Sequence, residues 1–344
     1  MFLAVAAALG AILPIAGIAV LEVASLEINV RSEARAPTRE GTYLEGFFVP
    51  DLRLGYGPRR FCRVSARRRL EGQNVYDVTY TTDALSRRVS PVPDPGGRSR
   101  HVLFFGCSFT FGEGVEDDET LPSQFGRQAP GYRPYNYGFC GYGPQAALAR
   151  LEQPSFRAGV AEPEGLAVFV YLAGHERRVV GSMRVVTQWG ASMPSYDVDG
   201  EGRLVLEGSF RSSRPLRMKL FALLAGSETL RLMGVDFPLR IGEGDYERTA
   251  RILAAARNAY SRTFRGRFLV VVYPTTDRRL RILPHLRRLG VEVVDFSGLF
   301  DPEAPGLCLP EDGHPSPRAL RIVARSLAQR LNVRPRNPGP RGGE

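Results

Sequence analysis

Lysine, cysteine, histidine and tryptophan are all scarce in this sequence of 344 residues. Lys219 is the only lysine among 46 basic residues, and the chain has four cysteines, four histidines and one tryptophan. The cysteines show neither a Cys-x-x-Cys motif nor a paired Cys/His spacing, which argues against a zinc site. The net charge of +10 comes from arginines that are scattered rather than interleaved with aromatic residues, so we expect no nucleic-acid partner.

Two of the cysteines, Cys107 and Cys140, follow predicted strands and allow two interpretations. They form a disulfide if the chain folds in an oxidising compartment, or they are two small buried residues, which we favour. No motif requires a metal ion or an organic cofactor, and we expect neither. The sequence leaves the oligomeric state open.

Charged residues are absent from 2–21. An apolar helix of about 20 residues, rising about 1.5 Å per residue, is about 30 Å long and matches the hydrocarbon core of a bilayer. We therefore predict a transmembrane anchor within 1–28. A cleaved signal peptide is the alternative, although no basic residue precedes the segment and no clear cleavage site follows it.

The orientation of this anchor is suggested by two opposing tendencies. Arg31 and Arg35 follow the apolar segment and favour a body on the cytoplasmic side. Large domains that follow an N-terminal anchor are most often exported, largely regardless of charge. We expect a periplasmic or otherwise extracytoplasmic body.

The rest of the chain divides into an extension, a main domain and a tail. Residues 29–97 are polar and rich in Pro, Gly and Arg, and end in a turn cluster. Within them, the β-forming run 75–82 predicts a strand that pairs with the main body. Residues 98–332 form the main domain, and 333–344 are a tail rich in Pro, Gly and Arg that we expect to be disordered.

Strand and helix patterns alternate through the main domain. This alternation predicts an α/β fold with three α/β/α layers around a mainly parallel sheet. An insertion near 183–212 contains a probable hairpin around 199–202. The expected strands are 102–106, 135–137, 166–173, 268–273 and 291–296, and the expected helices are 120–129, 144–152, 216–233, 246–264, 278–289 and 319–331.

Polar and glycine-rich segments follow the predicted strands, where the carboxyl ends of a parallel sheet gather a site. Ser108 lies in the turn after the strand 102–106, and the glycine-rich run 138–143 follows the next strand. Asp312 and His314 lie just before the last helix. A serine, a histidine and a carboxylate are the groups needed for nucleophilic acyl transfer.

These residues resemble the SGNH (GDSL-type) hydrolases, and the resemblance covers roughly 101–332. The family's first block is matched by Gly-Cys-Ser-Phe-Thr-Phe-Gly at 106–112, its second by Asn136 through Gly141, and its last by Asp312 and His314. The resemblance implies a serine esterase or O-acyltransferase without a cofactor. It implies that Ser108 is the nucleophile, that His314 and Asp312 complete the triad, and that the Gly141 N–H binds the oxyanion.

Three departures from the family pattern bear on this interpretation. Cys107 replaces the usual aspartate, and the Gly-x-Asn-Asp block is missing, which leaves His175 as a candidate oxyanion donor. Asp312 precedes His314 by two residues where three is commonest, so Glu311 is the alternative acid. Membrane-anchored relatives with this layout often act on acylated glycans or lipids of the bacterial envelope, so the resemblance implies a substrate of this kind. The alternative function is a catalytically inactive SGNH-like domain that binds glycan or scaffolds a partner.

Overall fold

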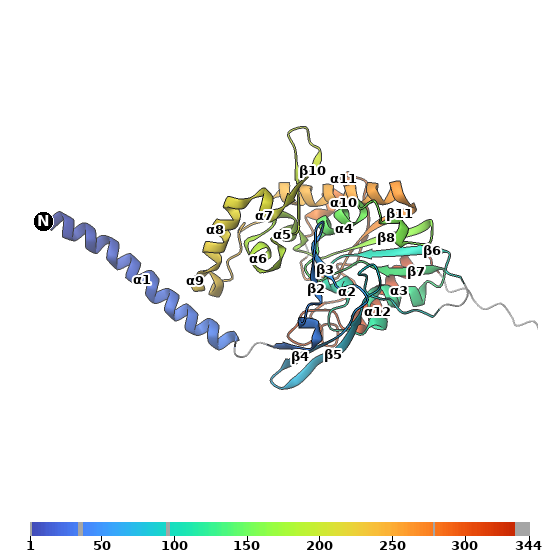
Figure 1. Ribbon diagram of the computed structural model, residues 1–344, viewed down its shortest axis with the longest axis horizontal. Coiled ribbons are helices and arrows are strands. Elements are labelled where there is room, and N and C mark those ends of the chain that lie inside the picture. Colours follow the sequence, from blue (N-terminus) through green and yellow to red (C-terminus); the bar gives the residue numbers. More distant parts are fainter. Residues whose placement is uncertain (1, 34–36, 94–96, 278, 334–344) are drawn as a thin grey trace, which may run out of the picture.

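The centre of the molecule is a parallel sheet of five strands (Figure 1). The computed structural model describes residues 2–33, 37–93, 97–277 and 279–333. The strand order is β12-β11-β8-β6-β7, and every neighbouring pair is parallel. This confirms the predicted parallel sheet. Its strands are β6 (Arg100–Phe105), β7 (Tyr132–Asn136), β8 (Glu164–Tyr171), β11 (Arg265–Val272) and β12 (Glu292–Asp295).

Helices cover both faces of this sheet, so the side chains of its central strands are buried on both sides. One core contains side chains of α3 (Leu121–Gln128) and α12 (Pro317–Arg330). The other contains side chains of α4 (Pro144–Leu151), α10 (Glu243–Thr263) and α11 (Ile282–Arg288). The predicted three-layer α/β/α architecture is confirmed, with each helix close to its expected range.

The N-terminal extension folds into small antiparallel sheets that pack against the main domain. The predicted strand at 75–82 is confirmed as β5, but it pairs with β4 inside the extension and not with the main sheet. Glu71 and Gly72, both with positive φ, form the tight turn that returns the chain onto β4. The elements are β1 (Thr38–Glu40), η1 (Thr42–Leu44), β2 (Phe48–Asp51), β3 (Gly55–Pro58), β4 (Arg63–Leu70) and β5 (Gln73–Thr81).

The insertion after β8 contains the predicted hairpin and several short helices. Strands β9 and β10 are antiparallel around the turn at 199–202. The helix predicted at 216–233 is two helices, because Ser227 caps a new helix after Gly226. The elements are α5 (His175–Val180), α6 (Met183–Val185), the π-helical turn η4 (Val186–Gly190), β9 (Pro194–Val198), β10 (Leu204–Ser209), α7 (Phe210–Ser213), α8 (Pro215–Ala225) and α9 (Glu228–Leu232).

The N-terminal helix α1 (Phe2–Glu33) begins away from the body and reaches it in its C-terminal half (Figure 1). Its last turns contact α9, where Glu22 accepts a hydrogen bond from the Glu228 N–H at 2.7 Å. The side chains of 1–16, which include most of the predicted membrane span, lie outside the described part. Within the described residues, no helix is both long and apolar enough to cross a bilayer. The predicted disordered tail lies outside the described residues from 334 onward.

Candidate active site

Ser108 lies at the carboxyl end of β6, at the start of the short helix α2 (Ser108–Phe111). The chain reaches it through Gly106, whose φ of 150° and contact with the Thr110 side chain leave no room for a Cβ atom. Ser108 is only 8% exposed. The turn therefore presents the hydroxyl at the sheet edge while the backbone around it is closely packed.

Asn136 connects the end of β7 to α2 and positions the loop that follows. Its Nδ2 donates to the Thr110 carbonyl at 2.9 Å, and its Oδ1 accepts from the Gly138 N–H at 3.0 Å. Gly141, farther along this loop, has a φ of 78° and lines the same cavity as Ser108. The segment that matches the family's second block is thus next to the serine in space.

Asp312 and His314 reach the serine from the loop before α12. The His314 Nε2 atom lies 2.8 Å from the Ser108 Oγ atom, and its Nδ1 atom is hydrogen-bonded to the Asp312 Oδ1 atom. A hydrogen bond of 2.8 Å from the Leu309 N–H to the His314 carbonyl holds the loop. With the proton on Nδ1, this order lets the Ser108 hydroxyl donate to Nε2.

The carboxylate of Asp312 is buried and paired with an arginine from the N-terminal extension. The Arg68 NH1 atom lies 2.8 Å from the Asp312 Oδ2 atom, and the side chain of Asp312 is fully buried. Burial alone would raise the pKa of Asp312. The hydrogen bond from His314 and the charges of His314 and Arg68 outweigh burial and hold that pKa below its usual range.

A second buried carboxylate, Glu113, lies beside the same histidine. Its Oε2 atom is 3.6 Å from the His314 Nε2 atom and accepts a hydrogen bond from the Cys140 thiol at 3.2 Å. Arg39 of β1 contacts the other oxygen at 3.0 Å. Burial, followed by the charge of Glu113, raises the pKa of Cys140 well above its usual value, so the thiol stays protonated. All four cysteines are free, so the disulfide alternative with Cys107 is not realised.

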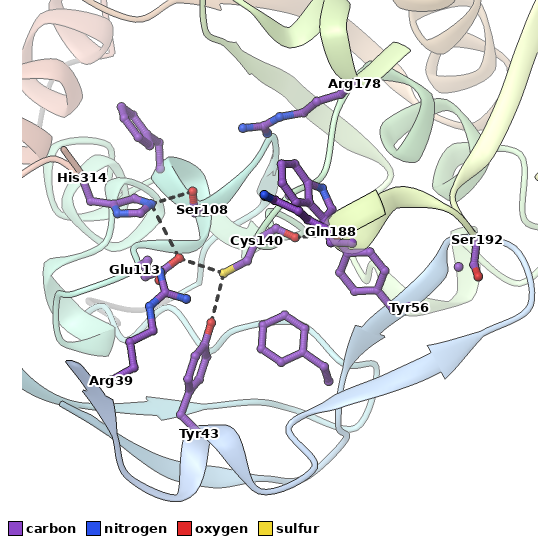
Figure 2. A pocket seen from close by; sticks show the side chains of 15 residues that line it. Arg39, Tyr43, Tyr56, Ser108, Glu113, Cys140, Arg178, Gln188, Ser192 and His314 are labelled. Carbon is purple, nitrogen blue, oxygen red and sulfur yellow. Dashed lines mark hydrogen bonds and ion pairs between the residues drawn. The ribbon is translucent and has the colours of Figure 1, made fainter. Parts of the chain in front are cut away.

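A cavity of about 740 Å³ opens above these groups (Figure 2). Figure 2 shows Ser108 and His314 on one wall, with Arg178 reaching in from the side opposite Arg39 and Tyr43. Much of the remaining wall is aromatic. The lining residues are Arg39, Tyr43, Phe48, Gly55, Tyr56, Ser108, Phe109, Glu113, Cys140, Gly141, Arg178, Gln188, Trp189, Ser192 and His314.

Two predicted site residues lie away from this arrangement. His175 is 1% exposed and does not line the cavity, because its ring packs edge-on against Phe169 and Tyr171 of β8. Its Nδ1 atom accepts from the Leu172 N–H at 3.4 Å, so it faces the sheet and not the serine. Glu311, the alternative acid, is exposed, and it is Asp312 that contacts the histidine.

Several residues at the site were not singled out from the sequence. Glu113 directly follows the serine block between two glycines, which is a local signal for a turn close to the nucleophile. Arg39 and Arg68 lie far away in an arginine-rich extension, and nothing in their sequence context distinguishes them. Arg178 follows the position of the missing family block. In the part of the chain that is described, no group of three or more His, Cys, Asp or Glu residues is placed to hold a metal ion.

Comparisons with known proteins give matches only among solved structures. No family model matches the chain, and no curated protein does. The fold is similar to that of a member of the lipolytic protein G-D-S-L family from Veillonella parvula, at 15% identity and a TM-score of 0.39, covering 69% of this chain and all of that one. A G-D-S-L family protein from Desulfitobacterium hafniense matches at 13% identity and a TM-score of 0.34, covering 67% of this chain and 98% of that one.

Proposed function

We propose that this protein is a serine hydrolase or O-acyltransferase that acts on acyl esters. The observation that supports it most directly is the hydrogen-bonded order of Ser108, His314 and Asp312. In this proposal the Ser108 Oγ atom attacks the ester carbonyl while His314 Nε2 accepts its proton. His314 then returns the proton to the leaving alcohol. Water, or a second alcohol in a transferase, releases the acyl group from the serine by the reverse sequence.

The negative charge that forms on the carbonyl oxygen needs preorganised donors. The N–H groups of Ser108 and Gly141 donate to no other backbone group within the described residues. Both residues line the cavity, so both donors are available to an oxyanion. The site therefore supports a two-donor oxyanion hole even though His175 is directed elsewhere.

Asp312 has the properties that this mechanism requires of the acid. Because its pKa is held below the usual range, the carboxyl is ionised at neutral pH. The carboxylate keeps the Nδ1 proton on His314 and stabilises the imidazolium that forms during attack. Arg68 balances this buried charge without contacting the cavity.

The substrate class remains part of the proposal. A cavity of about 740 Å³ with aromatic walls accommodates more than a short acyl chain, which favours an ester on a glycan or a lipid.

Attachment to a membrane through 2–21, with the body outside the cytoplasm, rests on the sequence alone. Carbonate extraction of membranes would leave an anchored protein in the pellet, whereas release into the supernatant would count against the anchor.

A serine-reactive fluorophosphonate probe tests the proposed activity on the full chain. We expect labelling of the wild type, no labelling of Ser108→Ala, and full labelling of the matched control Cys107→Ala, which changes the neighbouring buried residue. Ester hydrolysis should fall with labelling, while the melting temperature of Ser108→Ala should stay near the wild-type value. A folded wild type that is neither labelled nor hydrolytic, and that binds glycan, would instead support the inactive binding protein.

A further inference from the structure

Arg178 lines the cavity close to the candidate catalytic groups but has no role in the proposed triad. It lies near the end of α5 and shares the cavity wall with Ser108, Gly141 and Trp189. Figure 2 shows its side chain directed into the cavity, on the side opposite Arg39. A substrate that places its ester at the serine and extends across the cavity toward Arg178 would contact this guanidinium.

The other arginines around the site are each paired with a carboxylate. Arg39 contacts Glu113 at 3.0 Å, and Arg68 contacts Asp312 at 2.8 Å. Arg177, the neighbour of Arg178 in the sequence, contacts Asp236 at 3.1 Å. Among the described residues, no carboxylate lies within ion-pair distance of Arg178. The cavity wall therefore carries one uncompensated positive charge.

Arg178 is also held in place by its surroundings. Its NH1 atom donates to the Tyr142 carbonyl at 2.5 Å, and its own carbonyl accepts from the Gln145 Nε2 atom at 2.9 Å. A guanidinium has five N–H donors, so this bond leaves most of them for a ligand. The charge of Arg178 also acts on the neighbouring His175. Burial is the first cause that holds the pKa of His175 well below its usual value, and the positive charge of Arg178 is the second.

We propose that Arg178 binds an anionic group of the substrate, a carboxylate or a phosphate, while the ester lies at Ser108. The proposal rests on the proposed hydrolase function and narrows its substrate to negatively charged acyl esters. The planar fork of an arginine suits both anions, since each accepts two parallel hydrogen bonds. The aromatic rings of Trp189 and Tyr56, which line the same cavity, complete a wall for the uncharged part of the substrate.

Three acetyl esters that share one ring test this proposal in the full-length protein. They are 4-acetoxybenzoate, 4-acetoxyphenyl phosphate and the neutral methyl 4-acetoxybenzoate, with acetate release as the readout. In Arg178→Gln we expect kcat/KM for at least one anionic ester to fall about 10- to 100-fold, mainly through KM. The neutral ester should be hydrolysed as by the wild type. A larger fall in kcat/KM for 4-acetoxybenzoate would identify a carboxylate ligand, and a larger fall for 4-acetoxyphenyl phosphate would identify a phosphate ligand.

Two further variants separate charge recognition from folding and from general loss of charge. Arg178→Lys keeps the charge without the fork and should retain part of the preference for the anionic ester. Arg321→Gln removes an exposed arginine of α12 outside the cavity and should leave kcat/KM unchanged for both the anionic and the neutral esters. An equal loss for neutral and anionic esters would overturn the proposal, because it would indicate an oxyanion or structural role. A wild-type protein that hydrolyses the neutral ester with the same kcat/KM as both anionic esters would also overturn the proposal.

A binding measurement keeps the test independent of the proposed reaction. Malonate and inorganic phosphate are titrated by calorimetry into the Ser108→Ala protein and into the double variant that also carries Arg178→Gln. Binding that is present in the first and lost in the second supports the anion site, even if no ester is hydrolysed. Binding that is absent from both proteins, or equal in both, overturns it. Failure of probe labelling with intact anion binding would refute the hydrolase alone.

Discussion

Arg68 offers a stringent test of how the N-terminal extension supports the candidate site. The substitution Arg68→Met keeps much of the side-chain volume but removes the charge that pairs with Asp312. The Asp312 carboxylate then stays buried with its Oδ2 atom deprived of its ion-pair partner. We expect both the folding stability and the activity to fall, and the activity to depend on pH in a different way.

The size of the stability loss follows from the geometry of the pair. At 2.8 Å and an effective dielectric constant of about 20, the Coulomb attraction is about 6 kcal/mol before desolvation is subtracted. Removing one partner of a buried pair costs about 3–5 kcal/mol. The Arg68 side chain is 15% exposed, so solvent screens the pair. We expect a loss of about 2–3 kcal/mol, and a fall in Tm of about 3–5 °C for a protein of this size.

The pH profile separates a role in positioning Asp312 from a purely structural one. The positive charge of Arg68 is one of the influences that lower the pKa of Asp312, so that pKa rises in Arg68→Met. As the solution is acidified, the variant therefore loses activity at a higher pH than the wild type. At neutral pH we expect kcat/KM to fall about tenfold, which corresponds to about 1.4 kcal/mol of transition-state stabilisation.

Two variants control for general effects of changing an arginine on β4. Arg69→Met removes a partly exposed arginine whose carboxylate contact, Glu40, is 3.9 Å away, and should cost less than about 1 kcal/mol. Arg68→Lys keeps a charge but loses the second contact, from Arg68 NH2 to the Glu311 carbonyl at 3.3 Å, and should be intermediate. Equal losses in Arg68→Met and Arg69→Met, or an unchanged acid limb in Arg68→Met, would refute the reasoning.

Two other substitutions test the loop and the buried histidine. Gly141→Ala should lower activity and Tm, because its Cβ atom would collide with the Tyr56 hydroxyl and lie 2.6 Å from the Trp189 Nε1 atom. Gly174→Ala is the control, since Gly174 also has a positive φ but has open space around it, and this variant should lose less activity and Tm. Equal losses in the two variants would show that backbone strain alone is responsible. The pKa of His175 is held well below its usual value, mainly by burial, so unfolding takes up a proton below about pH 6.5 and stability falls as the pH drops through this range. In His175→Leu the difference between Tm at pH 7.5 and Tm at pH 5.5 should shrink, and an unchanged difference would contradict that assignment.

The extension is part of the candidate site and not only a connection to the N-terminal helix. Its Arg39 and Arg68 each contact a buried carboxylate next to His314, and its Tyr43 lies 3.5 Å from the Cys140 sulfur. The rings of Phe47 and Tyr80 pack against Phe111 of α2, three residues after Ser108. The fold of the extension and the geometry around Ser108 are therefore coupled.

Sequence patterns were sufficient for the parallel sheet and for most of its helices. The predicted runs 102–106, 166–173 and 268–273 form most of β6, β8 and β11 and are apolar throughout, as expected for strands buried on both faces. This property is local to each run. The pairing of β5 with β4 was not predicted, because strand pairing depends on which edge is available as well as on β propensity. The division at Gly226 was missed, since the leucine-rich pattern continues across it.

Within the site, the sequence determined the groups that can react, and the tertiary structure decided how they are tuned. Ser108 was identifiable because it follows a predicted strand, and the carboxyl ends of parallel strands meet at one edge. His314 was identifiable because it lies with Asp312 in a short segment just before the last predicted helix. Arg68 and Arg178 depend on contacts between segments that are remote in sequence, and Arg68 lies more than two hundred residues from its partner Asp312. Charge compensation in a buried site acts through distance and exclusion of water, and only the folded chain specifies these.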